Sequence, residues 1–201
     1  PGTVDRMGSA LDMTTAARPT GISDADLVRA ARDGDRFAQD ALYRRHSKRA
    51  AALAARLLAS SQDVEDVLHD AFLEALTTLD ALREPAAFRP WLLRIVVSCV
   101  RQRMLRRGLL RRLGLHRSGD DVSLEAQASA SASPEHLAEL SLVDDVLRRQ
   151  PVDDRIAWKL RRVEGYSIDE VAELCAVSAT TVKRRVGRLD RRVARLVEVD
   201  S

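Results

Sequence analysis

The sequence predicts an all-α protein, in which two small helical domains are joined by a flexible linker and the C-terminal domain is a helix-turn-helix. Apolar residues recur every three or four positions along most of the chain, and the alternation typical of strands is missing. Glycine is sparse, with 9 residues among 201. Hydrophobic residues make up 45% of the chain but aromatic residues only 3%, so we expect cores of Leu, Val and Ala.

The domain boundaries are predicted from changes in composition. Residues 1–21 are small, polar and unpatterned, and we expect them to be disordered. Residues 22–113 form the first domain, residues 114–134 the linker and residues 135–201 the second domain. The linker prediction depends on a Ser-Gly-Asp-Asp segment that is followed by alternating Ala and Ser, a composition typical of flexible connections.

Two helical stretches begin the first domain. Ser23 or Asp24 can accept the first free backbone N–H groups of a helix that continues towards Gly34. The second stretch covers residues 37–58, and its many alanines predict a close-packing surface. His46 stands alone there, so we interpret it as a structural or exposed residue rather than as a metal ligand.

The stretch from Ser61 to Leu82 predicts a strongly acidic helix. Ser61 can cap it, and apolar residues recur at helical spacing over four turns. No Lys or Arg occurs from Gln62 to Leu82. The helix dipole favours acids near the N-terminus, and the remaining excess indicates a docking surface for a basic partner. A hydrolase that uses these carboxylates is an alternative, but the sequence offers no supporting ligand set, and we predict no enzyme, metal or cofactor.

A strongly basic helix follows. Two prolines, Pro85 and Pro90, fix the loop before it, and Trp91 is predicted to begin the helix. Between Trp91 and Arg117 there are eight arginines and no acidic residue. Like charges at these spacings repel each other, so the run is hard to explain by helix stability and is typical of phosphate binding.

The last third of the chain predicts the helix-turn-helix. Ser167 and Glu170 have the spacing of a capping box at the start of a two-turn helix. A tight corner at residues 176–177 comes next, and Ser178 can cap a longer helix. The longer helix combines one apolar stripe with many basic residues, which suits binding in the major groove of DNA.

Two further features bound the class of protein. Cys99 and Cys175 lie on apolar faces without a CxxC motif, so we expect buried free thiols. No stretch approaches the ~18–20 apolar residues of a membrane span, and no signal peptide is visible. We therefore expect a cytoplasmic protein that does not insert into a membrane.

Taken in order from about Ser23 to Arg195, these elements resemble the extracytoplasmic-function (group IV) sigma factors of the sigma-70 family. Three motifs carry the resemblance: Asp63-Val-Glu-Asp-Val-Leu-His-Asp-Ala-Phe72, Phe88-Arg-Pro-Trp-Leu-Leu-Arg-Ile95, and Gly165-Tyr-Ser-Ile-Asp-Glu-Val-Ala172 followed by Val177-Ser-Ala-Thr-Thr-Val-Lys183. The resemblance implies a promoter-specificity subunit of bacterial RNA polymerase, with polymerase core, promoter DNA and an anti-sigma factor as partners.

The resemblance also implies three sets of site residues. The set that would dock on the clamp helices of the largest polymerase subunit is Asp63, Glu65, Asp66, Asp70 and Glu74. The set that would open the −10 promoter element, together with the loop at residues 82–90, is Phe88, Trp91, Arg94, Ser98, Arg101, Arg103, Arg106 and Arg107. The set that would read the −35 element is Ser178, Thr180, Thr181, Lys183, Arg184, Arg185 and Arg188.

The chain departs from the family pattern at two places. Ser98 stands where many relatives carry Asn, which removes a bidentate amide contact. Cys175 and Ala176 replace a more usual Leu-Gly corner, which predicts an altered turn. The alternative function is a stand-alone dimeric helix-turn-helix regulator, which would bind duplex DNA tightly without polymerase.

Overall fold

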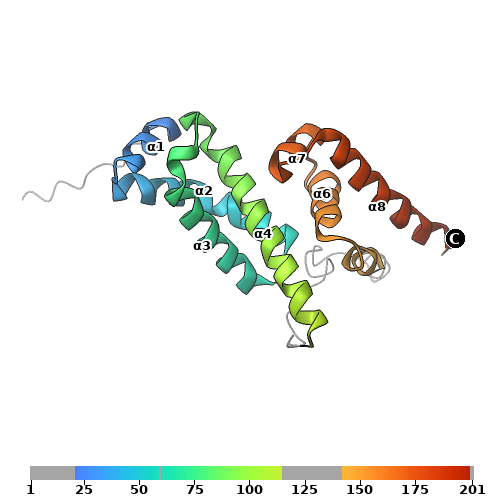
Figure 1. Ribbon diagram of the computed structural model, residues 1–201. Helices are drawn as coiled ribbons and strands as arrows, with labels where there is room; N and C mark the ends of the chain where they lie inside the picture. The colour runs from blue at the N-terminus through green and yellow to red at the C-terminus, as the bar shows by residue number, and fades with distance from the viewer. Residues whose placement is uncertain (1–20, 59, 115–141, 200–201) are drawn as a thin grey trace, which may run out of the picture.

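The computed structural model describes residues 21–58, 60–114 and 142–199, and its regular elements there are all helical, as predicted. Figure 1 shows two neighbouring groups of helices, α1–α4 and α6–α8. Residues 115–134 of the predicted linker (114–134) and residues 1–20 of the predicted N-terminal segment (1–21) lie outside the described residues. The helices are α1 (Asp24–Arg32), α2 (Arg36–Leu57), α3 (Ser61–Thr77), the 3₁₀ turns η1 (Leu79–Ala81) and η2 (Pro85–Ala87), α4 (Phe88–Arg112), α6 (Val152–Arg162), α7 (Ile168–Cys175) and α8 (Ala179–Val199), and residues 142–148 are also helical.

The acidic helix α3 differs from its prediction at both ends. Its N-cap is Ser60 rather than Ser61, and the Ser60 hydroxyl accepts from the backbone N–H of Asp63 at 3.4 Å. The helix stops at Thr77 instead of continuing to Leu82. The hydroxyls of Thr77 and Thr78 donate to carbonyls of the last turn, and such local bonds compete with further helix formation.

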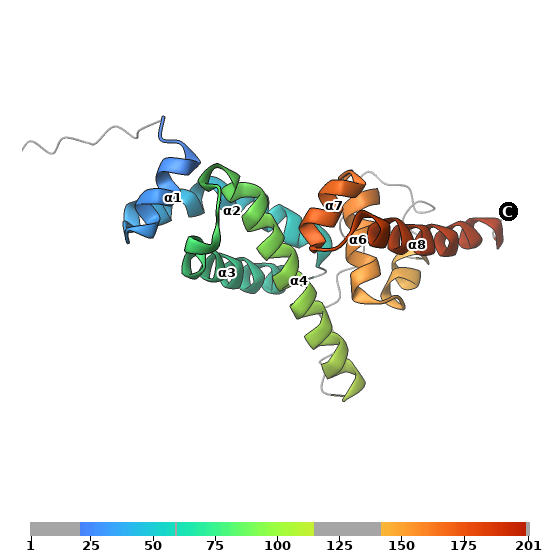
Figure 2. The same cartoon turned by 45° about the horizontal axis from the view of Figure 1, so that its top comes forward.

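The basic helix α4 begins three residues earlier than predicted, at Phe88 rather than Trp91. Pro90 therefore lies in its first turn, where a missing backbone N–H leaves no intrahelical bond unmade. The helix then continues to Arg112, and its C-terminal half extends away from the other helices (Figure 2). This half exposes both basic and apolar side chains: Arg106, Arg111, Arg112, Leu105, Leu109 and Leu113.

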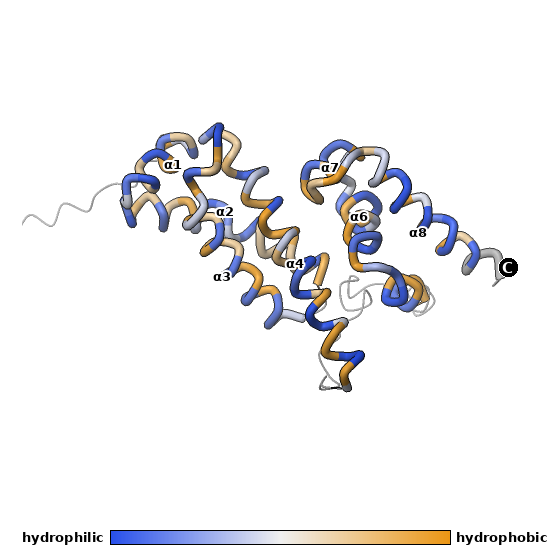
Figure 3. Tube along the Cα trace, viewed as in Figure 1, coloured by the Kyte–Doolittle hydropathy of each residue, from blue (hydrophilic) through white to orange (hydrophobic). Residues whose placement is uncertain are grey.

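The core consists of aliphatic side chains, as the composition predicts. Leu42, Leu53 and Val96 are at most 1% exposed. The same apolar cluster continues across α4 into the second group, where it includes Ile156 and Val171. The two groups of helices therefore share buried apolar surface. By contrast, Figure 3 shows long hydrophilic stretches along α8.

Polar contacts add to this shared surface. Glu164 pairs with Arg56 of α2. Lys159 of α6 is only 6% exposed, and its Nζ lies 3.4 Å from the Arg56 carbonyl oxygen. Burial lowers the Lys159 pKa from 10.5 to about 8, with the nearby charge of Asp144 opposing the shift. The unfolded chain binds more protons between these two pH values, so this group makes stability rise with pH over that interval.

The helix-turn-helix forms as its local sequence predicts. The Ser167 hydroxyl accepts from the Glu170 N–H at 3.2 Å, and the Glu170 carboxylate accepts from the Ser167 N–H at 2.8 Å, which confirms the capping box. Ala176 ends α7 with a φ of 51°, in the left-handed region. Ser178 caps α8 through the N–H of Thr181, at 3.2 Å.

The two cysteines differ in burial. Cys99 is 8% exposed, as predicted, whereas Cys175 is only partly buried; both are free thiols. Burial raises their pKa values to about 12 for Cys99 and about 11 for Cys175. Within the described ranges, no helix has the length and apolar character needed to cross a membrane.

Candidate nucleic-acid interface

Four of the residues predicted to contact the −10 element form one stripe along α4. Trp91, Arg94, Ser98 and Arg101 follow each other at spacings of three and four, so they share a helix face. Arg94, Ser98 and Arg101 are exposed, and Trp91 is half-buried. All four line a cavity of about 670 Å³ that is bounded on its other side by α6 and α7. We call them the α4 stripe.

Phe88 does not belong to this surface. Its side chain is completely buried, and its ring centroid lies 5.2 Å from that of His46 and 6.0 Å from that of Trp91. The structure therefore does not present Phe88 to DNA, and a base could stack on it only after the core had opened. His46 is structural, as predicted, and its Nε2 lies 2.9 Å from the Asp24 carboxylate.

Asp63 was predicted on the exposed acidic face, and this placement is wrong. Its side chain is buried and binds two arginines of α4, Arg103 and Arg107, each at 2.7 Å. Asp66 lies 2.5 Å from the same Arg103 guanidinium. A carboxylate at the N-terminal turn of α3 thus neutralises cations of the neighbouring helix. Arg106 remains exposed beside them.

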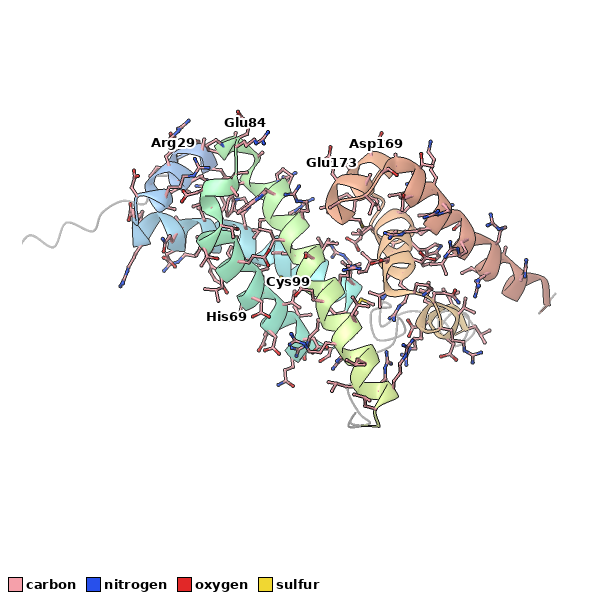
Figure 4. All side chains as sticks on the ribbon, in the orientation of Figure 1. Arg29, His69, Glu84, Cys99, Asp169 and Glu173 are labelled. Atoms are coloured by element: carbon pink, nitrogen blue, oxygen red, sulfur yellow. The ribbon has the colours of Figure 1, made fainter. Side chains whose placement is uncertain are left out.

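The other acids of α3 are exposed, but they do not form one uniform surface. Glu65, Asp66 and Asp70 face solvent. Glu74 lines the cavity beside the α4 stripe, and its Oε2 lies 3.7 Å from the Sγ of Cys99, which Figure 4 labels on α4. Leu73 is 56% exposed on the same helix. Sequence reasoning missed Leu73, although it falls outside the inward spacing of its neighbours.

Of the residues predicted to read the −35 element, some are exposed and others are held by contacts within the protein. Thr180, Lys183 and Arg184 are exposed at the beginning of α8. The hydroxyls of Ser178 and Thr181 lie 2.9 Å apart and form the helix cap. The helix start therefore offers one hydroxyl and two cations to a ligand, while its cap holds the backbone in place.

Two arginines of α8 are instead bound within the protein by acids of α6. Arg188 lies 2.8 Å from Asp154, and Arg185 lies 3.2 Å from Asp153. Asp153 also pairs with Arg101 of the α4 stripe at 2.5 Å. One carboxylate thus bridges an arginine from each of the two predicted DNA-binding surfaces. This contact was not predicted, because acids in the first turn of a helix are ordinarily explained by its dipole.

A second groove, of about 950 Å³, lies between the start of α4 and α7. The wall that includes the start of α4 carries mainly arginines, whereas the wall formed by α7 carries acids. Figure 4 shows Glu173 at the end of α7 that faces α4. The first wall carries four arginines, Arg49, Arg83, Arg89 and Arg94, and one acid, Glu84, and the acids of α7 are Glu170 and Glu173.

Comparison with known proteins assigns the family. A model of Sigma-70 region 2 matches residues 42–120, and a model of Sigma-70, region 4 matches residues 140–189. The ECF RNA polymerase sigma factor SigM of Mycobacterium tuberculosis is 36% identical over 175 residues, which cover 87% of this chain and 85% of that protein. The chain belongs to the extracytoplasmic-function sigma factors. It directs RNA polymerase to promoters and is not an enzyme.

Other relatives of this sigma factor agree with the assignment. The ECF RNA polymerase sigma-E factor of Escherichia coli is 32% identical, over 83% of this chain and 90% of that protein. The structure of CnrH in complex with the cytosolic domain of CnrY covers 89% of this chain with a TM-score of 0.57 and 26% identity. The sigma factor RpoE from Bartonella quintana, solved with the anti-sigma factor NepR, has the same fold, with a TM-score of 0.55 and 23% identity over 77% of this chain.

Proposed function

We propose that this sigma factor divides its task among three surfaces. The exposed part of the acidic α3 helix binds the clamp helices of the largest polymerase subunit. The α4 stripe and the loop before it open the −10 element, and the start of α8 reads the −35 element. The observation that carries the proposal is that exposed residues of each predicted set cluster on a different helix: Asp66 on α3, Arg94 on α4 and Lys183 on α8.

The docking surface on α3 combines charge with one apolar side chain. Glu65 and Asp70 supply negative charge that attracts a basic helix, Asp66 shares its charge with Arg103, and exposed Leu73 supplies an apolar anchor. Interfaces are typically held by a few buried anchors with charges at the rim, which mainly accelerate association. Asp63 contributes indirectly, because it holds α3 against α4.

The −10 surface combines cations with one aromatic side chain. Arg94 and Arg101 can neutralise phosphates, and the half-buried Trp91 offers a ring on which an unpaired base can stack. Opening of the duplex is then favoured because the unpaired strand binds better than the paired one. Ser98 supplies a hydroxyl in the same stripe.

The proposed −35 surface follows the usual geometry of a helix-turn-helix. The first turns of α8 present Thr180, Lys183 and Arg184 together, where side chains reach base edges and phosphates at once. We further propose an anti-sigma factor as a partner, supported by the Bartonella quintana sigma factor that was solved with one. We also propose that the protein acts in the cytoplasm, where polymerase and promoter DNA are found.

The test is transcription in vitro with core polymerase on pooled genomic fragments. The intact protein should produce start sites that share spaced −35 and −10 elements. Replacing Lys183 and Arg184 with Ala should weaken recruitment, whereas replacing Arg94 and Arg101 should slow opening. Tight binding of duplex DNA by the protein alone, without initiation, would support the stand-alone regulator instead. Equal effects of both pairs on every step would refute the division of surfaces.

A further inference from the structure

Arg32, in the last turn of α1, is bonded to the connection between α3 and α4. Its guanidinium donates to the carbonyl oxygen of Leu79 from NH2 at 3.1 Å and from Nε at 3.3 Å. The same NH2 also donates to the carbonyl oxygen of Leu82. These partners lie 47 and 50 residues further along the chain, so only the tertiary fold brings them together.

The connection itself has a buried side and an exposed side. We call residues 78–87 the α3–α4 loop. Leu79 and Leu82 are 3% and 5% exposed and anchor it in the core, while Arg83 and Glu84 face solvent. Helix α1 also packs against the η2 turn of the loop. Figure 4 shows Glu84 at the same end of the molecule as Arg29 of α1.

The Arg32 contacts lie where the loop changes direction. Leu79 begins the η1 turn, and Leu82 leaves it in an extended conformation, with φ of −74° and ψ of 105°. Within the turn, the carbonyl oxygen of Leu79 also accepts from the backbone N–H of Leu82 at 3.1 Å, so Arg32 adds a second donor there and reaches the Leu82 carbonyl at the end of the turn. One planar guanidinium satisfies both carbonyls, which sets the angle at which the loop continues towards Glu84.

The side-chain ion pair of Arg32 is a minor part of this arrangement. Asp80 lies 3.9 Å from the Arg32 Nε, and its side chain is 93% exposed. A pair with such exposure contributes little free energy in water. The Arg32 side chain is 25% exposed, so its bonds to the two carbonyls are better protected from solvent.

The loop position matters because the loop lines the second groove, beside the α4 stripe. Arg83 and Glu84 belong to the wall of that groove, together with Trp91 and Arg94. A shift of the loop at Leu82 would therefore move two charged side chains relative to the stripe. Arg32 does not line the groove in the described structure, so it would act only through the loop.

We propose that Arg32 is a positioning residue that holds the α3–α4 loop in the conformation needed to bind the unpaired strand of the −10 element. This inference rests on the proposed function of the loop and the α4 stripe. The distinctive requirement is a fork-shaped donor, because a lysine ammonium at the same place has the charge but cannot match two carbonyls in one plane. The bonds to Leu79 and Leu82 therefore predict that Lys cannot fully replace Arg32.

The experiment compares Arg32→Met and Arg32→Lys with the wild-type chain in the reconstituted holoenzyme. The probes are a single-stranded oligonucleotide with the −10 non-template sequence and a duplex with the −35 sequence, both taken from a promoter found by transcription of genomic fragments. Arg29→Lys is the matched control, since Arg29 is on the same helix, is 63% exposed and pairs only locally with Asp26 among the described residues.

We expect Arg32→Met to weaken binding of the single strand about tenfold while binding of the −35 duplex stays unchanged. Arg32→Lys should fall between Arg32→Met and wild type, and Arg29→Lys should match wild type. Should Arg32→Met fold poorly, Arg32→Lys carries the test, because it keeps the charge and the aliphatic stem.

The contrary outcomes are distinct from one another. Equal single-strand binding by Arg32→Lys and wild type would overturn the inference. A parallel loss of both DNA affinities would assign Arg32 to general stability and also overturn it. If the wild-type holoenzyme itself did not bind the single strand, the proposed −10 function would fail, and the Arg32 inference would fail with it.

Discussion

Replacing Asp153 with Asn should increase the affinity of the free protein for duplex promoter DNA. Asp153 now binds Arg101 at 2.5 Å and Arg185 at 3.2 Å, and these arginines come from the two surfaces proposed to contact DNA. The amide would remove the negative charge that competes with DNA phosphates for both guanidiniums. It would also weaken the contact between α6 and α4, which lets the two surfaces separate.

The expected size of the effect follows from exposure. The side chains of Asp153, Arg101 and Arg185 are 29%, 50% and 17% exposed, so each ion pair contributes about 0.5 kcal/mol after screening by solvent. Loss of both pairs therefore favours DNA binding by about 1 kcal/mol, which is about fivefold in affinity. Added salt should reduce the difference, because exposed charges are screened.

The assay is fluorescence anisotropy of a labelled promoter duplex with the full-length protein at low and high salt. Asp169→Asn is the matched control, because Asp169 is also in the first turn of a helix but forms no ion pair with the residues that the structure describes. It changes the net charge by the same amount. An equal gain from both variants, or no gain from Asp153→Asn, would refute the reasoning.

Three further predictions concern stability, and each can be measured by chemical unfolding. Lys159→Met should stabilise the protein by about 3 kcal/mol at neutral pH, because burial lowers the lysine pKa to about 8. The variant should also lack the rise in stability that the wild type shows between pH 8 and 10.5. A variant with the same pH profile as wild type would contradict this. Ala176→Gly should stabilise the protein by about 0.5–1 kcal/mol, because the φ of 51° strains any residue with a Cβ. A loss of stability would instead mean that the methyl group of Ala176 packs favourably. Asp63→Asn should destabilise the protein by about 3 kcal/mol, because Arg103 and Arg107 would lose the negative charge that they now bind. The control is Glu65→Gln, which changes an exposed acid of the same helix. Similar small effects of both variants would show that Asp63 is not structural.

The sequence by itself determined the elements that depend on neighbouring residues. The capping box at Ser167 and Glu170 needs only a spacing of three, and the structure contains it. The α4 stripe from Trp91 to Arg101 follows from helical periodicity alone. The three family motifs are likewise local, so the family could be recognised before any fold was known.

The helix ends were less predictable, because competing local bonds decide them. The Thr77 and Thr78 hydroxyls end α3 early, and the first turn of α4 accepts Pro90, which had suggested a later start. Such choices depend on small differences in free energy between alternative hydrogen bonds, and a residue pattern does not resolve them.

Only the tertiary structure decided which charged residues are available to partners. Asp63 and Arg103 are 40 residues apart in the chain, and Arg101 and Asp153 are 52 apart, so nothing in either local segment reveals that they meet. A carboxylate and a guanidinium look equally solvent-facing on their own helices. Packing of one helix on another removes them from water, and the cost of burying a single charge then requires that they pair.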